Sequence, residues 1–387
     1  MWAMHLLLAL ALLLGVMLGD LRAQTVWTVP NGADLTPFIS QASPGDILQL
    51  GASHPSFVLN KGLVIQTAGT TIQGSLGGPW WLGGTVQVSV PTGQRASLER
   101  LSLPSGSDGY SIYSGSLILQ GNVVVADVTV DGFVQVNGGC CILQRLDVWN
   151  GMLQVTTGLC EITHSVLRGR NSGGWPPYGN TRAVEQTGGM LVASRVTATG
   201  GHASPYFTNH QAAVRVVGGS AFFTDCNLTG GDGFDVWSTG APALIGNGAL
   251  AIARTTLTSG TSLSGSTASS GFAPVPTMVG MDCAAAPVRG SSLVVVATAG
   301  SSQGLLGIVG GYDATPKTIA PIVEPLFGMP SQLVALAIAL PAPGAQVAHV
   351  VTVPNLAILS GSEVWLQAVQ LDGAQIRAST VVGGTIR

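Results

Sequence analysis

The sequence predicts an all-β protein: a right-handed parallel β-helix (solenoid) with an N-terminal capping helix, followed by a small β-sandwich. Charged residues make up only 9% of the 387 residues, which excludes a solvated helical surface with many ion pairs. The 54 glycines suit strands joined by tight turns, because glycine adopts positive φ without steric cost. A strand pattern also recurs through the middle of the chain, and repetition of a fixed frame is typical of a solenoid.

The chain begins with an apolar run from Leu6 to Leu18, followed by Leu21-Arg22-Ala23. The run is too short to span a bilayer comfortably and has the length of a signal-peptide core. We therefore expect residues 1–23 to be a signal peptide, with an uncleaved anchor as the alternative. The expected location is extracellular or at the cell surface, or else the periplasm. No later stretch is long and apolar enough to predict a membrane span.

Six copies of the repeat align on a marker glycine that separates two strands. The markers are Gly121, Gly139, Gly158, Gly189, Gly219 and Gly248, at steps of 18, 19, 31, 30 and 29 residues. The second and fourth residues after each marker are apolar, and we expect them to face the interior because strand side chains alternate sides. A constant frame with variable insertions places residues 24–262 in the β-helix.

The sixth residue after each marker is ionisable. These residues are Asp127, Arg145, His164, Arg195, Asp225 and Arg254, and Arg100 takes the same place in a weaker preceding copy. Coils stack about 4.8 Å apart, so the column is predicted to form a ladder in which Asp127 and Asp225 each lie between two arginines. A corner ladder that keeps the register is favoured over a track for ligand.

The five cysteines are an odd number, so at least one is unpaired within the chain. Cys141 and Cys160 share the second column in neighbouring coils, about 4.8 Å apart, which is within disulfide range. A disulfide and a buried pair of free thiols remain equal alternatives. No pair of Cys or His has zinc-ligand spacing, so no metal and no other cofactor is predicted.

The segment after residue 32 carries a family signature. Residues 33–42 read as a short amphipathic helix, a PGD turn leads into a strand, and an N-K-G-L-hydrophobic-I segment follows. The matching residues are Pro44, Gly45, Asp46, Asn60, Lys61, Gly62, Leu63 and Ile65. This arrangement resembles the opening of pectin-lyase-like right-handed parallel β-helix proteins. The resemblance covers residues 25–262 and implies that the helix closes the end of the coil.

The same superfamily includes lyases, hydrolases, epimerases, adhesins and inert scaffolds, so the resemblance implies a fold more than an activity. Its pectate-lyase-like members use an Arg base with carboxylates that hold calcium, and its polygalacturonase-like members use clustered Asp residues. This chain has neither an R-x-P-x-x-R run nor the N-T-D and D-D motifs. No catalytic residue is therefore carried over, and calcium has no support.

Residues 281–387 lack the coil frame and read as several short strands, which predicts a small β-sandwich. Within them, residues 353–372 are similar to a segment of a small terminal β-sandwich of exported bacterial proteins. Residues 263–280 are rich in Ser, Gly and Pro and are expected to be a linker. We expect the module to cap the open end of the coil, where strand edges would otherwise be unpaired.

Three consecutive coils carry insertions at the same corner, at residues 170–182, 201–211 and 231–240. Because the frame returns after each one, the loops should emerge side by side on one flank, where a rigid scaffold presents them. The residues predicted to bind ligand there are Trp175, Tyr178, Arg182, Tyr206, Phe207, Phe234 and Trp237. Aromatic faces beside polar groups suit sugar rings. The alternative is that the aromatic side chains only pack on one another.

Two functions follow from this flank. The first is a secreted, non-catalytic scaffold that binds extracellular polysaccharide through the three loops. The second is a polysaccharide lyase or glycoside hydrolase, with Asp232 and Asp235 as a carboxylate pair, or His202 or His210 as a base. The scarcity of carboxylates and the missing motifs favour the scaffold. A net charge of −3 gives no support for a nucleic-acid partner.

Overall fold

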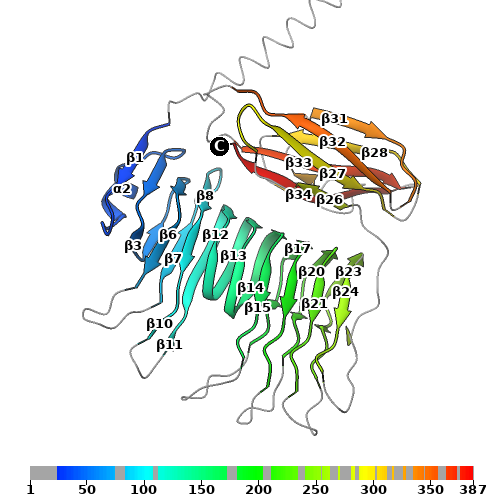
Figure 1. Cartoon of the computed structure of the whole chain (residues 1–387), viewed down its shortest axis with the longest axis horizontal. Coiled ribbons are helices and arrows are strands. Elements are labelled where there is room, and N and C mark those ends of the chain that lie inside the picture. Colours follow the sequence, from blue (N-terminus) through cyan, green and yellow to red (C-terminus); the bar gives the residue numbers. More distant parts are fainter. Residues whose placement is uncertain are drawn as a thin grey trace, which may run out of the picture.

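The computed structural model describes residues 24–74, 83–107, 112–171, 181–203, 211–233, 240–253, 255–261, 269–270, 280–283, 287–300, 303–311, 316–317, 326–327, 334–343, 345–355, 363–372 and 375–386. They form a parallel β-helix with a β-sandwich alongside it (Figure 1). The predicted fold class is confirmed. Within these ranges no helix has the length and apolarity needed to cross a membrane. The expected signal peptide lies outside them.

Each coil contributes to three parallel faces. Face 1 contains β1 (Val26–Val29), β2 (Ile47–Leu50), β5 (Val64–Thr67), β8 (Arg95–Glu99), the last parts of β12 (Gly115–Ala126), β13 (Thr129–Gln144) and β14 (Asp147–Thr163), then β17 (Met190–Ser194), β20 (Ser220–Thr224) and β23 (Ala249–Ala253). Of the three long strands, β13 and β14 also continue through the corner at which the later coils carry insertions.

Face 2 contains β3 (Ser53–Pro55), β6 (Thr70–Gln73), β9 (Leu101–Leu103), the first parts of β13 and β14, β15 (Val166–Arg168), β18 (Thr197–Thr199), β21 (Asn227–Thr229) and β24 (Thr256–Thr258). Face 3 contains β4 (Phe57–Leu59), β7 (Thr85–Ser89), the first part of β12, the middle of β13 and β14, β16 (Val184–Gln186), β19 (Val214–Val216), β22 (Leu244–Gly246) and β25 (Ser269–Ser270). A short antiparallel pair, β10 (Gly106–Ser107) and β11 (Ile112–Tyr113), adjoins the coil. The insertions lie at the corner between faces 2 and 3, which we call the loop corner.

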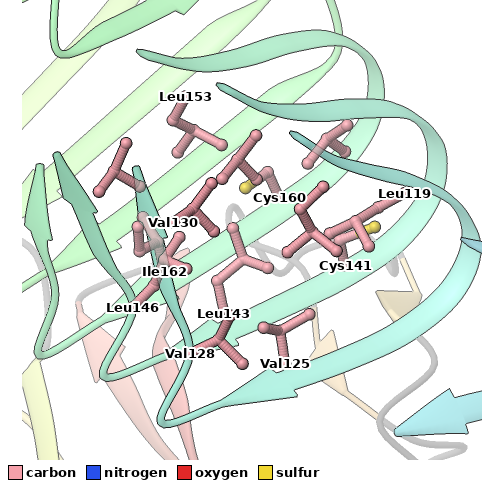
Figure 2. Close-up of a cluster of buried hydrophobic side chains, with 14 of the residues drawn as sticks. Leu119, Val125, Val128, Val130, Cys141, Leu143, Leu146, Leu153, Cys160 and Ile162 are labelled. Carbon is pink, nitrogen blue, oxygen red and sulfur yellow. The ribbon is translucent and has the colours of Figure 1, made fainter. Parts of the chain in front are cut away.

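The interior of the coil is filled by the columns that the frame predicted. Val125 pairs in register with Leu143, and Leu143 with Ile162, and all three side chains point inward and are buried (Figure 2). Burying an aliphatic side chain of this size contributes roughly 1.5–3 kcal/mol, so each coil adds a similar increment to one continuous core.

The second column includes the cysteine pair. Cys141 and Cys160 are direct register partners and are both buried free thiols (Figure 2). Of the two alternatives, the stacked free thiols are therefore observed. Burial raises the pKa of Cys141 to about 12 and raises that of Cys160 well above its usual value. Both side chains act as small apolar core residues.

The marker glycines form the corner between faces 3 and 1. Gly139 has a φ of +79°, which L-residues with a side chain adopt rarely. A Cβ atom at Gly139 would lie 2.2 Å from the carbonyl oxygen of Gly121 in the preceding coil. The corner therefore needs glycine for both its conformation and its close stacking.

The ionisable column forms the corner between faces 1 and 2. Its described members have left-handed backbone conformations, with φ between 50° and 55°; they are Arg100, Asp127, Arg145, His164, Arg195 and Asp225. Backbone hydrogen bonds tie consecutive corners together, for example from Asp127 N to the carbonyl of Gln144. Arg145 donates from Nη2 to Asp127 Oδ2 over 3.1 Å. The predicted stacking of the column is therefore confirmed for these residues, and one of the expected Asp–Arg pairs, Asp127 with Arg145, is observed. The expected position of Asp225 between two arginines stays a prediction, because Arg254 lies outside the described residues.

Helix α2 (Thr36–Gln41) covers the N-terminal end of the coil, where the family signature has a structural role. The Lys61 ammonium donates to three carbonyls at the C-terminal end of this helix, those of Ile39, Ser40 and Ala42, over 2.7–3.0 Å. Buried Asp46 accepts hydrogen bonds from the amides of Thr25 and Ser43. The motif therefore attaches the capping helix and the first strand to the coil.

The C-terminal module contains a three-stranded sheet of β26 (Gly280–Cys283), β27 (Ser292–Thr298) and β32 (Gln346–Thr352), and a four-stranded sheet of β31 (Val334–Ala339), β28 (Leu306–Gly311), β33 (Glu363–Asp372) and β34 (Gln375–Thr385). A short pair, β29 (Pro316–Lys317) and β30 (Leu326–Phe327), is antiparallel. The larger sheets share a core that includes Val295, Ile308 and Leu366. Most of the expected linker lies outside the described residues, so its bounds remain a prediction.

The module lies along the side of the coil, against face 1 (Figure 1). Trp365 is 2% exposed and packs with Val124, Ile142 and Val192, whose side chains point outward from face 1. The Arg95 guanidinium lies 5.2 Å from the centre of the Trp365 ring. The sequence led us to expect that the module packs on the open end of the coil. That expectation was wrong for Trp365, which packs on face 1 instead. An outward apolar column on face 1 supplies a docking surface in the middle of the coil.

Candidate functional site at the loop corner

The structure describes only part of the predicted site. Arg182, His202 and Asp232 belong to the described residues, at the bases of the three loops. The other predicted residues lie outside the described ranges: Trp175, Tyr178, Tyr206, Phe207, His210, Phe234, Asp235 and Trp237. Their roles remain predictions. The geometry described below is therefore that of the bases of the three loops.

The bases of successive loops stack in register. The amide of Gly201 donates to the carbonyl of Thr181 over 3.0 Å, and the amide of Gly231 donates to that of Gln211 over 2.9 Å. A Cβ atom at Gly201 would lie 2.0 Å from the carbonyl oxygen of Arg170, so glycine allows this close approach. The loops therefore leave the coil from neighbouring positions on one flank.

A ladder of polar side chains, which we call the stem ladder, crosses these bases. It consists of Asn171, His202, Asp232 and Thr261, one from each of four consecutive coils. Asn171 Oδ1 accepts a hydrogen bond from the amide of His202 over 3.0 Å. The amide and the hydroxyl of Thr261 both donate to Asp232 Oδ1 over 2.7 Å. Each loop base is thus joined to the next by side-chain hydrogen bonds as well as by backbone.

His202 and Asp232 are in direct contact at the centre of the stem ladder. His202 Nδ1 lies 2.9 Å from the backbone nitrogen of Asp232 and 3.1 Å from its Oδ2. A neutral ring either accepts the amide N–H at Nδ1 or, in the other tautomer, donates from Nδ1 to the carboxylate and leaves Nε2 as an acceptor; a protonated ring also donates from Nδ1 to the carboxylate. In both states Asp232 fixes the orientation of the imidazole.

The Asp232 carboxylate is stabilised in its ionised form. Burial raises its pKa, but the two hydrogen bonds from Thr261 and the neighbouring His202 lower it by more, so the pKa lies below the ordinary 3.8. A general acid in glycoside hydrolysis needs a raised pKa. Asp232 is therefore suited to orient His202 or to act as a base or nucleophile, and its predicted pairing with Asp235 is untested.

A second polar cluster lies beside the stem ladder, on face 3. Glu185 Oε1 accepts hydrogen bonds from Arg182 over 3.3 Å and from Arg215 over 3.0 Å. Burial lowers the pKa of Arg182, Glu185 raises it, and Arg215 lowers it, with a lowered pKa as the net result. Arg182 is thus held in place by a neighbouring carboxylate, with its guanidinium aligned at the base of the first loop.

Arg170 links the first loop to earlier coils. Its Nη2 donates to Ser114 Oγ over 2.6 Å, and its Nε donates to the carbonyl of Asn150 over 3.3 Å. Asn150 in turn donates to Asp131 Oδ1 over 3.1 Å. The loop corner is therefore a continuous polar edge, and its arginines, carboxylates, histidine and hydroxyls are groups that hydrogen-bond to sugar hydroxyls.

No family model matches the chain. No curated protein matches it either. Among solved structures, it is similar to the enzymatically active domain of tailspike protein 2 from bacteriophage CBA120, at a TM-score of 0.37 and 8% sequence identity. The likeness covers 92% of this chain and 76% of the tailspike chain. At that TM-score it carries no inference about function.

In the described part of the chain, no cluster of three or more His, Cys, Asp or Glu side chains has an arrangement that could hold a metal ion. The described groups at the loop corner are hydrogen-bonding side chains. They orient one imidazole, hold two guanidinium groups around a carboxylate, and keep another carboxylate ionised.

Sequence reasoning missed Asn171, Thr261 and Arg215 as site residues. The repeat could have identified the first two, because Asn171, His202, Asp232 and Thr261 each follow their marker glycine by thirteen residues. Arg215 and Glu185 each precede the next marker by four residues. Counting the frame beyond the ninth position, and backward from each marker, would have found both clusters.

Proposed function

We propose that this protein is a secreted β-helix scaffold of the pectin-lyase-like superfamily that binds an extracellular polysaccharide through the three loops of the loop corner. The observation that carries the proposal is the register of the loop bases, which stack coil on coil and are joined by the stem ladder. A rigid base of this kind reduces the entropy lost when loops order around a ligand.

The chemistry of the loops supports a sugar ligand. Six aromatic residues lie in the three loop sequences, and the described bases add arginine, histidine, carboxylate and hydroxyl groups. Aromatic faces pack on the C–H faces of sugar rings, and polar groups bond their hydroxyls. The apolar run before Ala23 supports export to a compartment where such a polymer is present.

A polysaccharide lyase or glycoside hydrolase is the second candidate function. The contact between His202 and Asp232 favours it, because a carboxylate that orients an imidazole is a common arrangement for a general base. In this version His202 accepts a proton and Asp232 orients the ring and stabilises its positive charge. The loop aromatics would then position substrate.

The test is a glycan array read together with reducing-end and unsaturated-uronide assays. The variants Trp175→Ala and Trp237→Ala are expected to weaken binding at least tenfold, with no turnover by the wild type. Gln87→Ala is the control, because Gln87 is an exposed residue of face 3 in a coil without these loops. Unchanged binding in both tryptophan variants would refute the proposal. Turnover that His202→Ala or Asp235→Ala abolishes would establish the enzyme instead.

A further inference from the structure

The outer side of face 2 carries a regular array of uncharged polar side chains, five hydroxyls and one carboxamide, on three consecutive strands. Strands β18, β21 and β24 read Thr-Ala-Thr, Asn-Leu-Thr and Thr-Leu-Thr. The middle residue of each faces the interior, and the outer two point away from it. The outward residues are Thr197, Thr199, Asn227, Thr229, Thr256 and Thr258, which we call the threonine array.

The array is held in strict register. Thr199 pairs with Thr229, and Thr229 with Thr258, without a bulge. Neighbouring positions are therefore about 4.8 Å apart between coils and about 6.6–6.8 Å apart along a strand. Threonine is β-branched, so the χ1 angle of the five threonine side chains is restricted in a strand. The array is a stiff lattice of hydrogen-bonding groups.

The array is accessible to a partner. Thr197, Asn227, Thr256 and Thr258 are exposed, and Thr199 and Thr229 are partly exposed. The C-terminal module packs on face 1, so its Trp365 contact does not involve this face. None of the six side chains is ionisable.

The same face continues toward the N-terminus with groups of a different kind. Arg168 lies 3.8 Å from the centre of the Trp149 ring, and it pairs with Asp147 over 3.0 Å. Trp149 remains 43% exposed, which is unusual for a side chain of its size. Arg168 and Asp147 cancel in charge, so the strip from Trp149 to Thr258 is uncharged overall. It combines an aromatic ring with repeated hydrogen-bonding groups.

The strip is continuous with the loop corner. Strand β18 ends at Thr199, and only Gly200 and Gly201 separate it from His202 of the stem ladder. A polymer bound at the loops thus meets face 2 immediately beside them. The stacking of coils repeats hydroxyls along the axis of the β-helix, which is also the direction in which the loops follow one another.

We infer that the outer side of face 2 is a second binding surface, specific for an uncharged polysaccharide that lies along the axis of the coil. The absence of net charge on the strip favours a neutral glycan over a polyuronate, and the repeated hydroxyls suit a repeating polymer. The inference deepens the proposed function and rests on it for the class of ligand. It adds two points to that function: the ligand is uncharged, and it contacts a surface separate from the loops.

The array is too small to favour a crystalline solid such as ice. Six positions of about 4.8 by 6.7 Å cover only about 200 Å². Beyond them the Arg168–Asp147 pair interrupts the lattice, which a flat crystal face would not accommodate. A single polymer chain tolerates such an interruption because its hydroxyls can bond the charged pair.

The test compares binding of the full chain to cellulose, mixed-linkage β-glucan, β-mannan and polygalacturonate by pull-down and affinity electrophoresis. The wild type is expected to bind at least one neutral polymer and to bind polygalacturonate at least tenfold more weakly. Thr229→Glu places a charge in the centre of the array and is expected to weaken neutral-polymer binding at least tenfold. The triple variant Thr199→Val, Thr229→Val and Thr258→Val keeps the β-branched shape and should lose binding to a similar extent.

Thr187→Glu is the matched control. Thr187 is exposed and belongs to the coil that contains β18, but it lies at the glycine corner, so binding should stay within twofold of the wild type. Preferential binding of polygalacturonate would overturn the inference. Unchanged binding in Thr229→Glu and in the triple valine variant would do so as well.

The same set separates this inference from the proposed function. Loss in Trp237→Ala with unchanged binding in Thr229→Glu would refute the inference and leave the loop site standing. Loss in Thr229→Glu with unchanged binding in Trp175→Ala and Trp237→Ala would refute the loop site and support face 2. A wild type that binds no glycan refutes both. Inhibition of ice recrystallisation that Thr229→Glu abolishes would replace the glycan with ice.

Discussion

Two tryptophans in this protein each lie beside an arginine, but they differ in burial, and that difference predicts very different losses of stability. Trp365 is 2% exposed between the C-terminal module and face 1, whereas Trp149 is 43% exposed on face 2. Arg95 lies over the first ring and Arg168 over the second. Replacing each by alanine therefore compares a buried interface tryptophan with its surface counterpart.

The magnitudes follow from burial. Truncating a buried Trp to Ala costs about 3–5 kcal/mol, from the lost transfer of apolar surface and from the cavity that remains. Trp365 fits this case because Val124, Ile142 and Val192 surround it. Trp149→Ala removes mainly a surface cation–π contact, worth about 0.5–1 kcal/mol. We expect Trp365→Ala to release the module from face 1 as well.

Urea unfolding followed by far-UV circular dichroism measures the two losses, and hydrogen exchange locates them. In Trp365→Ala, amides of β17 and β34 should exchange faster, because these neighbouring strands lie at the interface. Exchange in Trp149→Ala should stay close to that of the wild type. Equal losses of stability in the two variants, or unchanged exchange at β17 in Trp365→Ala, would show that Trp365 does not hold the module on the coil.

Three further predictions concern the cap, the core and the stem ladder. Lys61→Met should destabilise the protein by about 1–3 kcal/mol in urea, because three helix-end carbonyls lose a charged donor, whereas Lys61→Arg should retain most of the stability. Native Cys141, with its pKa raised to about 12, should not react with a thiol reagent at pH 8 until the protein is unfolded; rapid native labelling would contradict its burial. The pKa of Asp232 is lowered in the folded state, so its contribution to stability is present above the unfolded pKa of about 3.9 and is lost as pH falls through the folded value. Wild type and Asp232→Asn should therefore differ slightly in stability at neutral pH and converge as the pH falls below the folded pKa. The difference should be small because the Asp232 side chain is 42% exposed. A difference independent of pH would refute this.

Local patterns in the sequence determined the coil and its corners. The marker glycines, the inward columns and the ionisable sixth column all follow from a strand period of two and a repeated frame. Because parallel coils stack residue on residue, Asp127 and Arg145 could be placed together although eighteen residues separate them. The helix was predicted from the amphipathic pattern of residues 33–42, and its place at the end of the coil was implied by the resemblance that the segment around Lys61 carries.

Only the tertiary structure decided where the C-terminal module lies. The outward apolar column of Val124, Ile142 and Val192 looks like any partly buried strand pattern until Trp365 covers it. Glu185 differs, because its partner Arg215 occupies the same position of the frame one coil later and could have been found by counting. Contacts within the frame repeat and can be counted, whereas a contact between the coil and a non-repeating module depends on surface complementarity that no period encodes.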